Sequence, residues 1–130
     1  MHGHHISLLS VPVSDPQRSK AFYVDKLGFD IVMDMEFGSG LRWVTLRPPG
    51  AEAAIALVTW FDTMPPGSLK GTVLAVDDIE STAAELRANG ALDDDEEIES
   101  APWGRWVSVE DPDGNSWVVQ QDNPQPFDFG

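Results

Sequence analysis

The strongest constraint on the fold of this chain is an internal repeat. The tripeptide Arg42-Trp43-Val44 recurs 63 positions later as Arg105-Trp106-Val107, and Gly28 has a counterpart 62 positions later in Gly90. A period of about 60 residues in a 130-residue chain predicts two similar structural modules rather than one irregular fold. We place the modules at about residues 6–61 and 70–121, followed by a C-terminal tail at 122–130, all within a single domain of 1–130.

The first half predicts a strand, a helix and three further strands. The helix begins at Asp15-Pro16, because an aspartate is a favoured N-cap and proline suits the first helical position, and it ends before Gly28. The strand candidates share apolar or β-branched composition and are separated by glycine and proline turns. They are residues 6–13, 29–36, 41–47 and 53–60.

The second half predicts the same β-α-β-β-β order. A strand at 72–76 leads into a helix in which Asp77, three residues before Glu80, resembles a capping box. The acidic run 93–97 occupies the place of the next strand and includes a loop, which we expect to be solvated rather than to hold a cation. Strands at 105–110 and 116–120 follow, joined by a turn at 111–115. The fold class is therefore α+β, with two tandem βαβββ modules.

The net charge and composition limit the classes of partner that the protein is expected to bind. The net charge is −14, with 22 acidic and 8 basic residues, and such a field repels phosphate backbones and anionic lipid surfaces. We therefore expect neither nucleic acid nor a membrane as a partner. The longest apolar stretches are far shorter than a bilayer span, and no secretory leader is recognisable, so we expect a cytoplasmic protein. With no cysteine in the chain, a metal would need nitrogen or oxygen ligands.

Three segments resemble a known superfamily. They are residues 13–29, the tetrapeptide Val76-Asp77-Asp78-Ile79, and the turn Asp111-Pro112-Asp113-Gly114-Asn115. In this order they resemble the vicinal oxygen chelate superfamily, which includes glyoxalase I, extradiol dioxygenases, fosfomycin-resistance enzymes and the bleomycin-resistance binding proteins. The resemblance covers about residues 6–121. It implies paired βαβββ modules whose mixed sheets curl into a cup with the helices outside, and often a homodimer.

The resemblance also locates the metal ligands of the catalytic members. By spacing from the motifs, the usual His, Gln or Glu positions correspond to Leu8, Gly71, Val118 and a position near Leu57. Apolar side chains donate nothing to a metal, and an oxygen or nitrogen site needs three or more convergent donors. We therefore expect neither a metal nor another cofactor at the usual site. The histidines, His2, His4 and His5, precede the first strand, where no fixed geometry is expected.

Other catalytic chemistry has few candidates. A serine-histidine relay is excluded, because no histidine falls within the predicted core. Glu110, and Glu36 beside Met33 and Met35, are carboxylates that could act as a general base if burial raised the pKa. The alternative is that each is an ordinary strand carboxylate facing solvent.

Tryptophan is abundant, with five residues in the chain, and four of them fall on or beside predicted strands. Alternation places Trp43 on the same face as Leu41 and Thr45, opposite Val44 and Leu46, but does not say which face meets the helix. Each tryptophan could belong to the core, yet the set favours an aromatic binding site with adaptable methionine walls. The candidate ligand-binding residues are Trp43, Trp60, Trp103, Trp106, Met33, Met35, Phe37 and Glu110.

The sequence therefore predicts a small-molecule-binding homodimer of the glyoxalase/bleomycin-resistance type, which sequesters an apolar or aromatic ligand without a metal. One alternative is a metal-dependent glyoxalase- or dioxygenase-like enzyme with rearranged ligands. Another is an interaction module whose acidic loop, residues 93–97, docks a basic partner. The polar, proline-rich tail is expected to be an arm or a disordered end, and through Phe127 and Phe129 it could instead dock on a partner.

Overall fold

A computed structural model describes residues 3–38 and 40–123, except for the side chain of Phe37. The predicted tail therefore lies outside the described residues from position 124 onward, and so do Phe127 and Phe129. The chain forms two compact units. The first is Met1–Leu69 together with Asp111–Asn115, and the second is Lys70–Glu110 together with Ser116–Gly130. The single domain stays a prediction.

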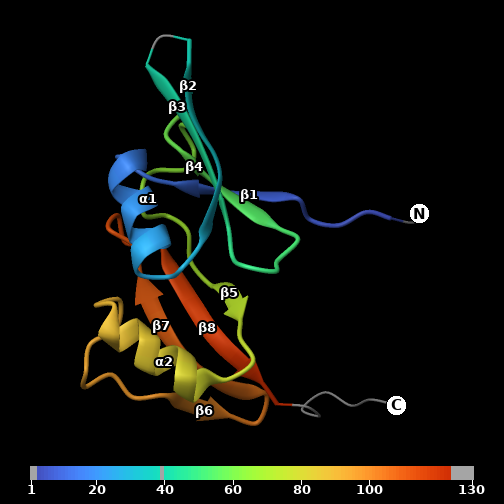
Figure 1. Cartoon of the computed structure of the whole chain (residues 1–130), viewed down its shortest axis with the longest axis vertical. Helices are drawn as coiled ribbons and strands as arrows, with labels where there is room; N and C mark the ends of the chain where they lie inside the picture. Colours follow the sequence, from blue (N-terminus) through green and yellow to red (C-terminus); the bar gives the residue numbers. More distant parts are fainter. Residues whose placement is uncertain (1–2, 39, 124–130) are drawn as a thin grey trace. The chain divides into compact units, whose positions relative to one another are not determined.

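The first unit contains a four-stranded mixed sheet and one helix (Figure 1). Its elements are β1 (Leu8–Pro12), α1 (Pro16–Asp25), β2 (Asp30–Phe37), β3 (Leu41–Arg47) and β4 (Ala54–Val58). The strand order is β1-β4-β3-β2, with β1 parallel to β4 and the other neighbours antiparallel. The side chain of Asp15 caps α1 by accepting hydrogen bonds from the backbone of Gln17 and Arg18, as predicted.

The second unit repeats this arrangement. Its elements are β5 (Thr72–Ala75), α2 (Ile79–Ala88), β6 (Glu99–Ala101), β7 (Gly104–Glu110) and β8 (Ser116–Asp122), and the strand order is β5-β8-β7-β6. Strand β5 is parallel to β8, while β7 is antiparallel to both of its neighbours. The two predicted βαβββ modules are thus confirmed.

Two local predictions need correction. The N-cap of α2 is Asp78 rather than Asp77, because the Asp78 carboxylate accepts the backbone N–H of Ser81. Glu80 does not complete a capping box but pairs with Arg105 on β7. The predicted strand 6–13 also shortens to β1, because only Leu8–Pro12 pair in register with β4. Ser7 and Val13, on either side, each share a single backbone hydrogen bond with β4.

A buried polar network ties the turn at 111–115 to the start of the first unit. The hydroxyl of Tyr23 on α1 donates to Asp111 Oδ2 at 2.8 Å, and Asn115 Nδ2 donates to the same oxygen at 2.8 Å. Asn115 Nδ2 also donates to the carbonyl of Pro12 at 2.7 Å, and Asn115 Oδ1 accepts the backbone N–H of Leu69. Since buried polar groups need partners, these hydrogen bonds hold the turn against the first unit, in addition to its role in reversing the chain.

None of the helices in the described residues is long and apolar enough to cross a membrane.

Candidate functional site

In the first sheet, α1 packs on one face, and the opposite face is accessible mainly along β2, because Thr45 on β3 and Ala56 on β4 are buried. Val44, Leu46 and Leu57 are fully buried on the side of α1, where Phe22 and Tyr23 pack. The bond from Lys20 on α1 to Asp34 on β2, which is paired with Val44, fixes the same side. Alternation then places Met33, Met35, Trp43 and Thr45 on the other side, which we call the open face of the first sheet.

The open face of the first sheet carries an aromatic pair. Trp43 stacks on Trp60, which follows β4, with ring centroids 5.3 Å apart and an interplanar angle of 17°. Met35 lies directly across from Trp43 in the register of β2 and β3, and Met33 lies across from Thr45. Met33 and Met35 are 42% and 51% exposed. The structure thus brings four of the predicted ligand-binding residues onto one accessible, apolar surface.

The second sheet has a corresponding open face. Val107, Val109 and Val119 are buried on the side of α2, and the ion pair of Arg105 with Glu80 lies on that side as well. Trp106, at the repeat position of Trp43, therefore points to the opposite side, together with Ser108 and Glu110. Trp106 stacks on Trp103, with centroids 6.2 Å apart and an interplanar angle of 9°. Each module thus presents a stacked tryptophan pair on its open face.

The remaining tryptophan, Trp117, belongs to the core. It is 3% exposed and is paired with Val109 across β7 and β8, on the side of α2. The structure therefore separates the tryptophans by sheet face, a distinction that composition could not supply.

The two candidate general bases fit the alternative given for them, that of a strand carboxylate facing solvent. Glu36 is paired with Arg42 and shares the α1 side of the sheet with Asp34, so it lies on the face opposite Met33 and Met35. Glu110 does share the open face of the second sheet with Trp106. Both glutamates are exposed, so neither has the burial that a general base of this kind would need.

Sequence analysis missed an ionic cluster around Asp34. Its carboxylate accepts from Lys20 Nζ at 2.5 Å and from Arg42 Nε at 2.6 Å. Hydrogen bonds from Arg42 and Lys20 lower the pKa of Asp34 from 3.8 to about 2, against the opposing effect of burial. The carboxylate in turn raises the pKa of Arg42. The cluster lies on the α1 side of β2. The sequence alone did not indicate it, because the register that sets Asp34 and Arg42 on one face is a property of the sheet.

The four positions at which the resemblance would place metal ligands do not form a metal site. Leu8 and Val118 are apolar, Gly71 has no side chain, and Leu57 points into the core beneath α1. Ala56, next to Leu57, lies on the open face and is paired with Thr45 and Ser10. None of these three residues supplies a carboxylate or imidazole ligand. Within the described residues, no three His, Cys, Asp or Glu side chains are grouped so that they could hold a metal ion. The residues present do not fit a metal centre.

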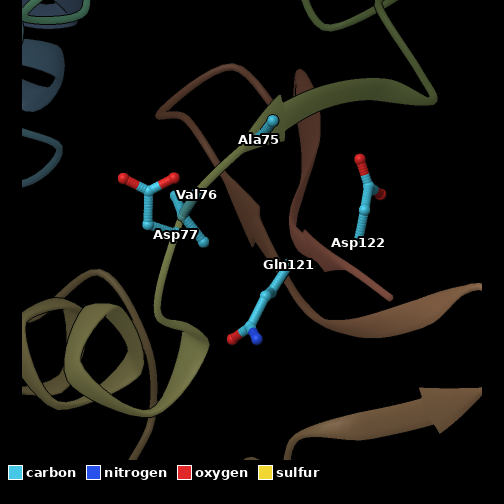
Figure 2. Close-up of a pocket in the computed structure, with 5 residues that line it drawn as sticks. All are labelled: Ala75, Val76, Asp77, Gln121 and Asp122. Carbon is cyan, nitrogen blue, oxygen red and sulfur yellow. The ribbon is translucent and has the colours of Figure 1, made fainter. Parts of the chain in front are cut away.

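A hollow of about 400 Å³ lies in the second unit where β5 leads into α2 (Figure 2). It is lined by Ala75, Val76, Asp77, Gln121 and Asp122. Gln121 Oε1 is engaged by the backbone N–H of Ile79 and Asp122 Oδ1 by Gln120, and Figure 2 shows the polar side chains pointing in different directions. These groups do not converge on a common ligand position, so the hollow is a poor candidate for a site.

Comparison with known proteins decides the family. Residues 4–119 match the profile of the Glyoxalase/Bleomycin resistance protein/Dioxygenase superfamily. The chain belongs to this superfamily.

Relatives within the superfamily include a binding protein. The crystal structure of TnmS3, an antibiotic binding protein from Streptomyces sp. CB03234, is 40% identical, with a TM-score of 0.83 over 95% of this chain and 99% of TnmS3. A superfamily member from Sphaerobacter thermophilus is 31% identical, with a TM-score of 0.79 over 91% of this chain and 97% of that one. The uncharacterized protein YetH of Bacillus subtilis (strain 168) is 30% identical over 89% of this chain and 97% of its own length. The recognition made from the three sequence segments is thus confirmed.

Proposed function

We propose that this superfamily member binds a small aromatic or otherwise apolar organic molecule, of the antibiotic type, without using a metal ion. The observation that carries the proposal is the Trp43–Trp60 stack beside Met33 and Met35 on the open face of the first sheet. The similarity to TnmS3, an antibiotic binding protein, supports the class of ligand.

The chemistry of this surface suits a flat ligand. Indole rings offer large, rigid apolar areas, and an aromatic pair gains about 0.5–1.5 kcal/mol beyond the area it buries. Unbranched methionine side chains adapt to irregular ligand outlines. The surface thus offers stacking and apolar burial, as a binding site for a flat apolar molecule requires.

We include the other predicted ligand-binding residues in the proposed binding surfaces. Trp103 and Trp106 form an equivalent stack in the second unit, where Trp103 is 44% exposed. Glu110 lies on the same strand and face as Trp106, about 13 Å along the strand, where it could orient a polar end of a long ligand. Phe37, whose side chain lies outside the described part, completes the proposed set.

We further propose that the protein is a homodimer. Apart from Met33 and Met35, β2 exposes two apolar side chains, Ile31 (52%) and Val32 (46%), on an edge strand of the sheet. An exposed apolar edge strand favours pairing with a second copy of the chain. Covering by a second copy would bury it, and sedimentation equilibrium would report a mass twice that of the chain, about 28 kDa from 14.2 kDa.

Tryptophan fluorescence tests the binding proposal. Flat aromatic antibiotics should quench the wild-type protein saturably, while non-aromatic antibiotics of similar size should not. Trp43→Phe keeps an apolar ring but loses the indole surface, and we expect it to raise the dissociation constant of the ligand about tenfold. The matched control is Trp117→Phe, which also removes one indole but lies in the core away from the open face.

The outcome of this pair of variants is decisive. Equal loss of affinity in Trp43→Phe and Trp117→Phe would show that the open face does not hold the ligand. Absence of saturable quenching for all aromatic compounds up to their solubility limits would overturn the proposed ligand class.

A further inference from the structure

The second sheet has an uncovered edge. Strand β7 pairs with β8 along its whole length from Gly104 to Glu110, but with β6 only from Gly104 to Trp106. In the first sheet, the corresponding strand β3 is paired with β2 along its whole length. Within the described residues, Val107–Glu110 therefore have no strand partner on the β6 side, and an exposed edge of this kind is a template for another strand.

The acidic loop runs beside this edge. A hollow of about 370 Å³ lies between the loop after α2 and the end of β7. Its lining is Ala91, Leu92, Asp93, Glu96, Ser108, Val109, Glu110 and Ser116. The buried Leu92 and Val109 supply an apolar base, whereas Asp93, Glu96 and Glu110 are exposed carboxylates.

The loop is held in place beside the strand. Arg87 Nη2 on α2 donates to the carbonyl of Glu96 at 2.6 Å, and the backbone N–H of Glu96 donates to the carbonyl of Asp93 at 3.2 Å. Leu92 is anchored by a backbone bond to Leu86 at 3.2 Å. The Asp93 and Glu96 side chains are thus displayed on a fixed loop next to the uncovered strand edge.

We infer that this edge binds an extended basic peptide segment, which adds to β7 as an antiparallel strand continuing the line of β6. The four uncovered residues span about 13 Å, enough for a short backbone ladder. Three carboxylates and no basic side chain line the hollow, so charge complementarity selects lysine or arginine in the peptide. This inference uses neither tryptophan pair, and Glu110 is the residue that it shares with the proposed ligand-binding set.

Strand alternation specifies the sequence pattern of the partner. Val107 and Val109 face the α2 side, whereas Ser108 and Glu110 face the open side. Residues directly opposite each other in a ladder share a face. The peptide should therefore alternate apolar and basic residues, so that one kind of side chain lies on the side of Val109 and the other on the side of Glu110.

The test is a calorimetric titration of the full chain with a capped octapeptide that alternates valine and lysine, with the valine/glutamate octapeptide as control. We expect saturable, salt-sensitive binding of the lysine peptide only. Two further lysine peptides, N-methylated at the odd or at the even positions, separate a backbone ladder from charge attraction. One of the two should lose binding at least tenfold and the other should keep it, because only one edge of the added strand pairs with β7.

Matched variants locate the site. Asp93→Asn/Glu96→Gln and Asp94→Asn/Asp95→Asn each remove two charges from the same acidic run, but only the first pair lines the hollow. We expect the dissociation constant of the lysine peptide to be at least five times higher for the first double variant than for the second.

Four outcomes would overturn the inference. They are no binding of the lysine peptide at 1 mM, equal losses in the two double variants, and retained binding of both methylated peptides. The fourth is concentration-dependent self-association that is abolished by Ser108→Pro, which would assign the edge to a second copy of the chain.

Discussion

At the scale of single residues, Asp34 shows how one carboxylate can link an edge strand to a helix and to the neighbouring strand. The carboxylate lies between Lys20 of α1 and Arg42 of β3, and its side chain is 14% exposed. An exposed ion pair contributes little, but two cations on one partly buried carboxylate form a network in which each bond orients the next.

The depressed pKa of Asp34 gives a pH-dependent prediction. Folding favours the ionised form, so the contribution of Asp34 to the free energy of unfolding is complete above about pH 4 and is lost as the pH falls towards about 2. Asp34→Asn should cost roughly 1–2 kcal/mol at pH 7, allowing for solvent screening. Urea unfolding at several pH values should show the difference from wild type shrinking between pH 4 and 2. Glu36→Gln, an exposed change on the same face, is the control, and an equal pH-dependent loss there would contradict the assignment.

Tyr23 gives a second prediction at this scale. Its hydroxyl is buried and donates to the ionisable Asp111, which also binds Asn115. Tyr23→Phe removes the donor and leaves part of a buried carboxylate unsatisfied, which should lower the free energy of unfolding by about 1.5–3 kcal/mol. Ser14→Ala removes an exposed hydrogen bond to Asp113 and should cost less than about 0.5 kcal/mol. Chemical denaturation compares the two variants, and similar costs would argue against the buried network.

At the scale of elements, variants at the N-caps distinguish the observed cap of α2, Asp78, from the predicted one, Asp77. Asp15→Ala and Asp78→Ala each remove a carboxylate that accepts helix N–H groups, so each should cost about 1 kcal/mol. Asp77→Ala should leave the free energy of unfolding nearly unchanged, since Asp77 is exposed and does not cap α2. Thermal unfolding of the three variants checks this order. A larger loss for Asp77→Ala than for Asp78→Ala would restore the original prediction.

Gly67 marks the closest approach between the turn at 111–115 and the loop that follows β4. It has a φ of +83°, and a Cβ added there would lie 2.1 Å from the carbonyl oxygen of Asp113. Gly50 has a similar φ of +78°, but nothing lies within 4 Å of its added Cβ. Gly50→Ala should therefore cost about 1–2 kcal/mol, the price of a left-handed alanine, and Gly67→Ala considerably more. Equal unfolding midpoints for the two variants would show that the turn does not pack against Gly67.

Most elements could be predicted from the sequence because their signals are local. Asp15-Pro16 and Gly28 bound α1, and the predicted range 41–47 is the observed β3. The N-cap of α2 was misplaced because Asp77 and Asp78 are adjacent and both have a suitable acceptor. The short β6 could not be delimited, because Glu99–Ala101 has little strand character and gains its ladder only from β7.

At the scale of the whole molecule, the repeat predicted the two modules, but the binding surface depended on tertiary structure. Alternation grouped Trp43 with Thr45, yet only the packing of Val44 and Leu46 beneath α1 showed that Trp43 faces away from the helix. The same information assigned Trp117 to the core and Glu36 to the wrong face for a site with Met35. Which face a helix covers is a long-range property that the spacing of residues in the chain does not contain.

We propose that this superfamily member binds an aromatic ligand without a metal ion. The most direct test of this proposal is calorimetric titration of protein stripped of metal by EDTA with flat aromatic antibiotics, repeated after loading with Mn, Fe, Co, Ni or Zn, with the ligand then recovered for mass spectrometry. We expect the same dissociation constant, within about twofold, in both preparations and an unchanged ligand mass. Binding that requires the metal, or a ligand recovered with an altered mass, would contradict it.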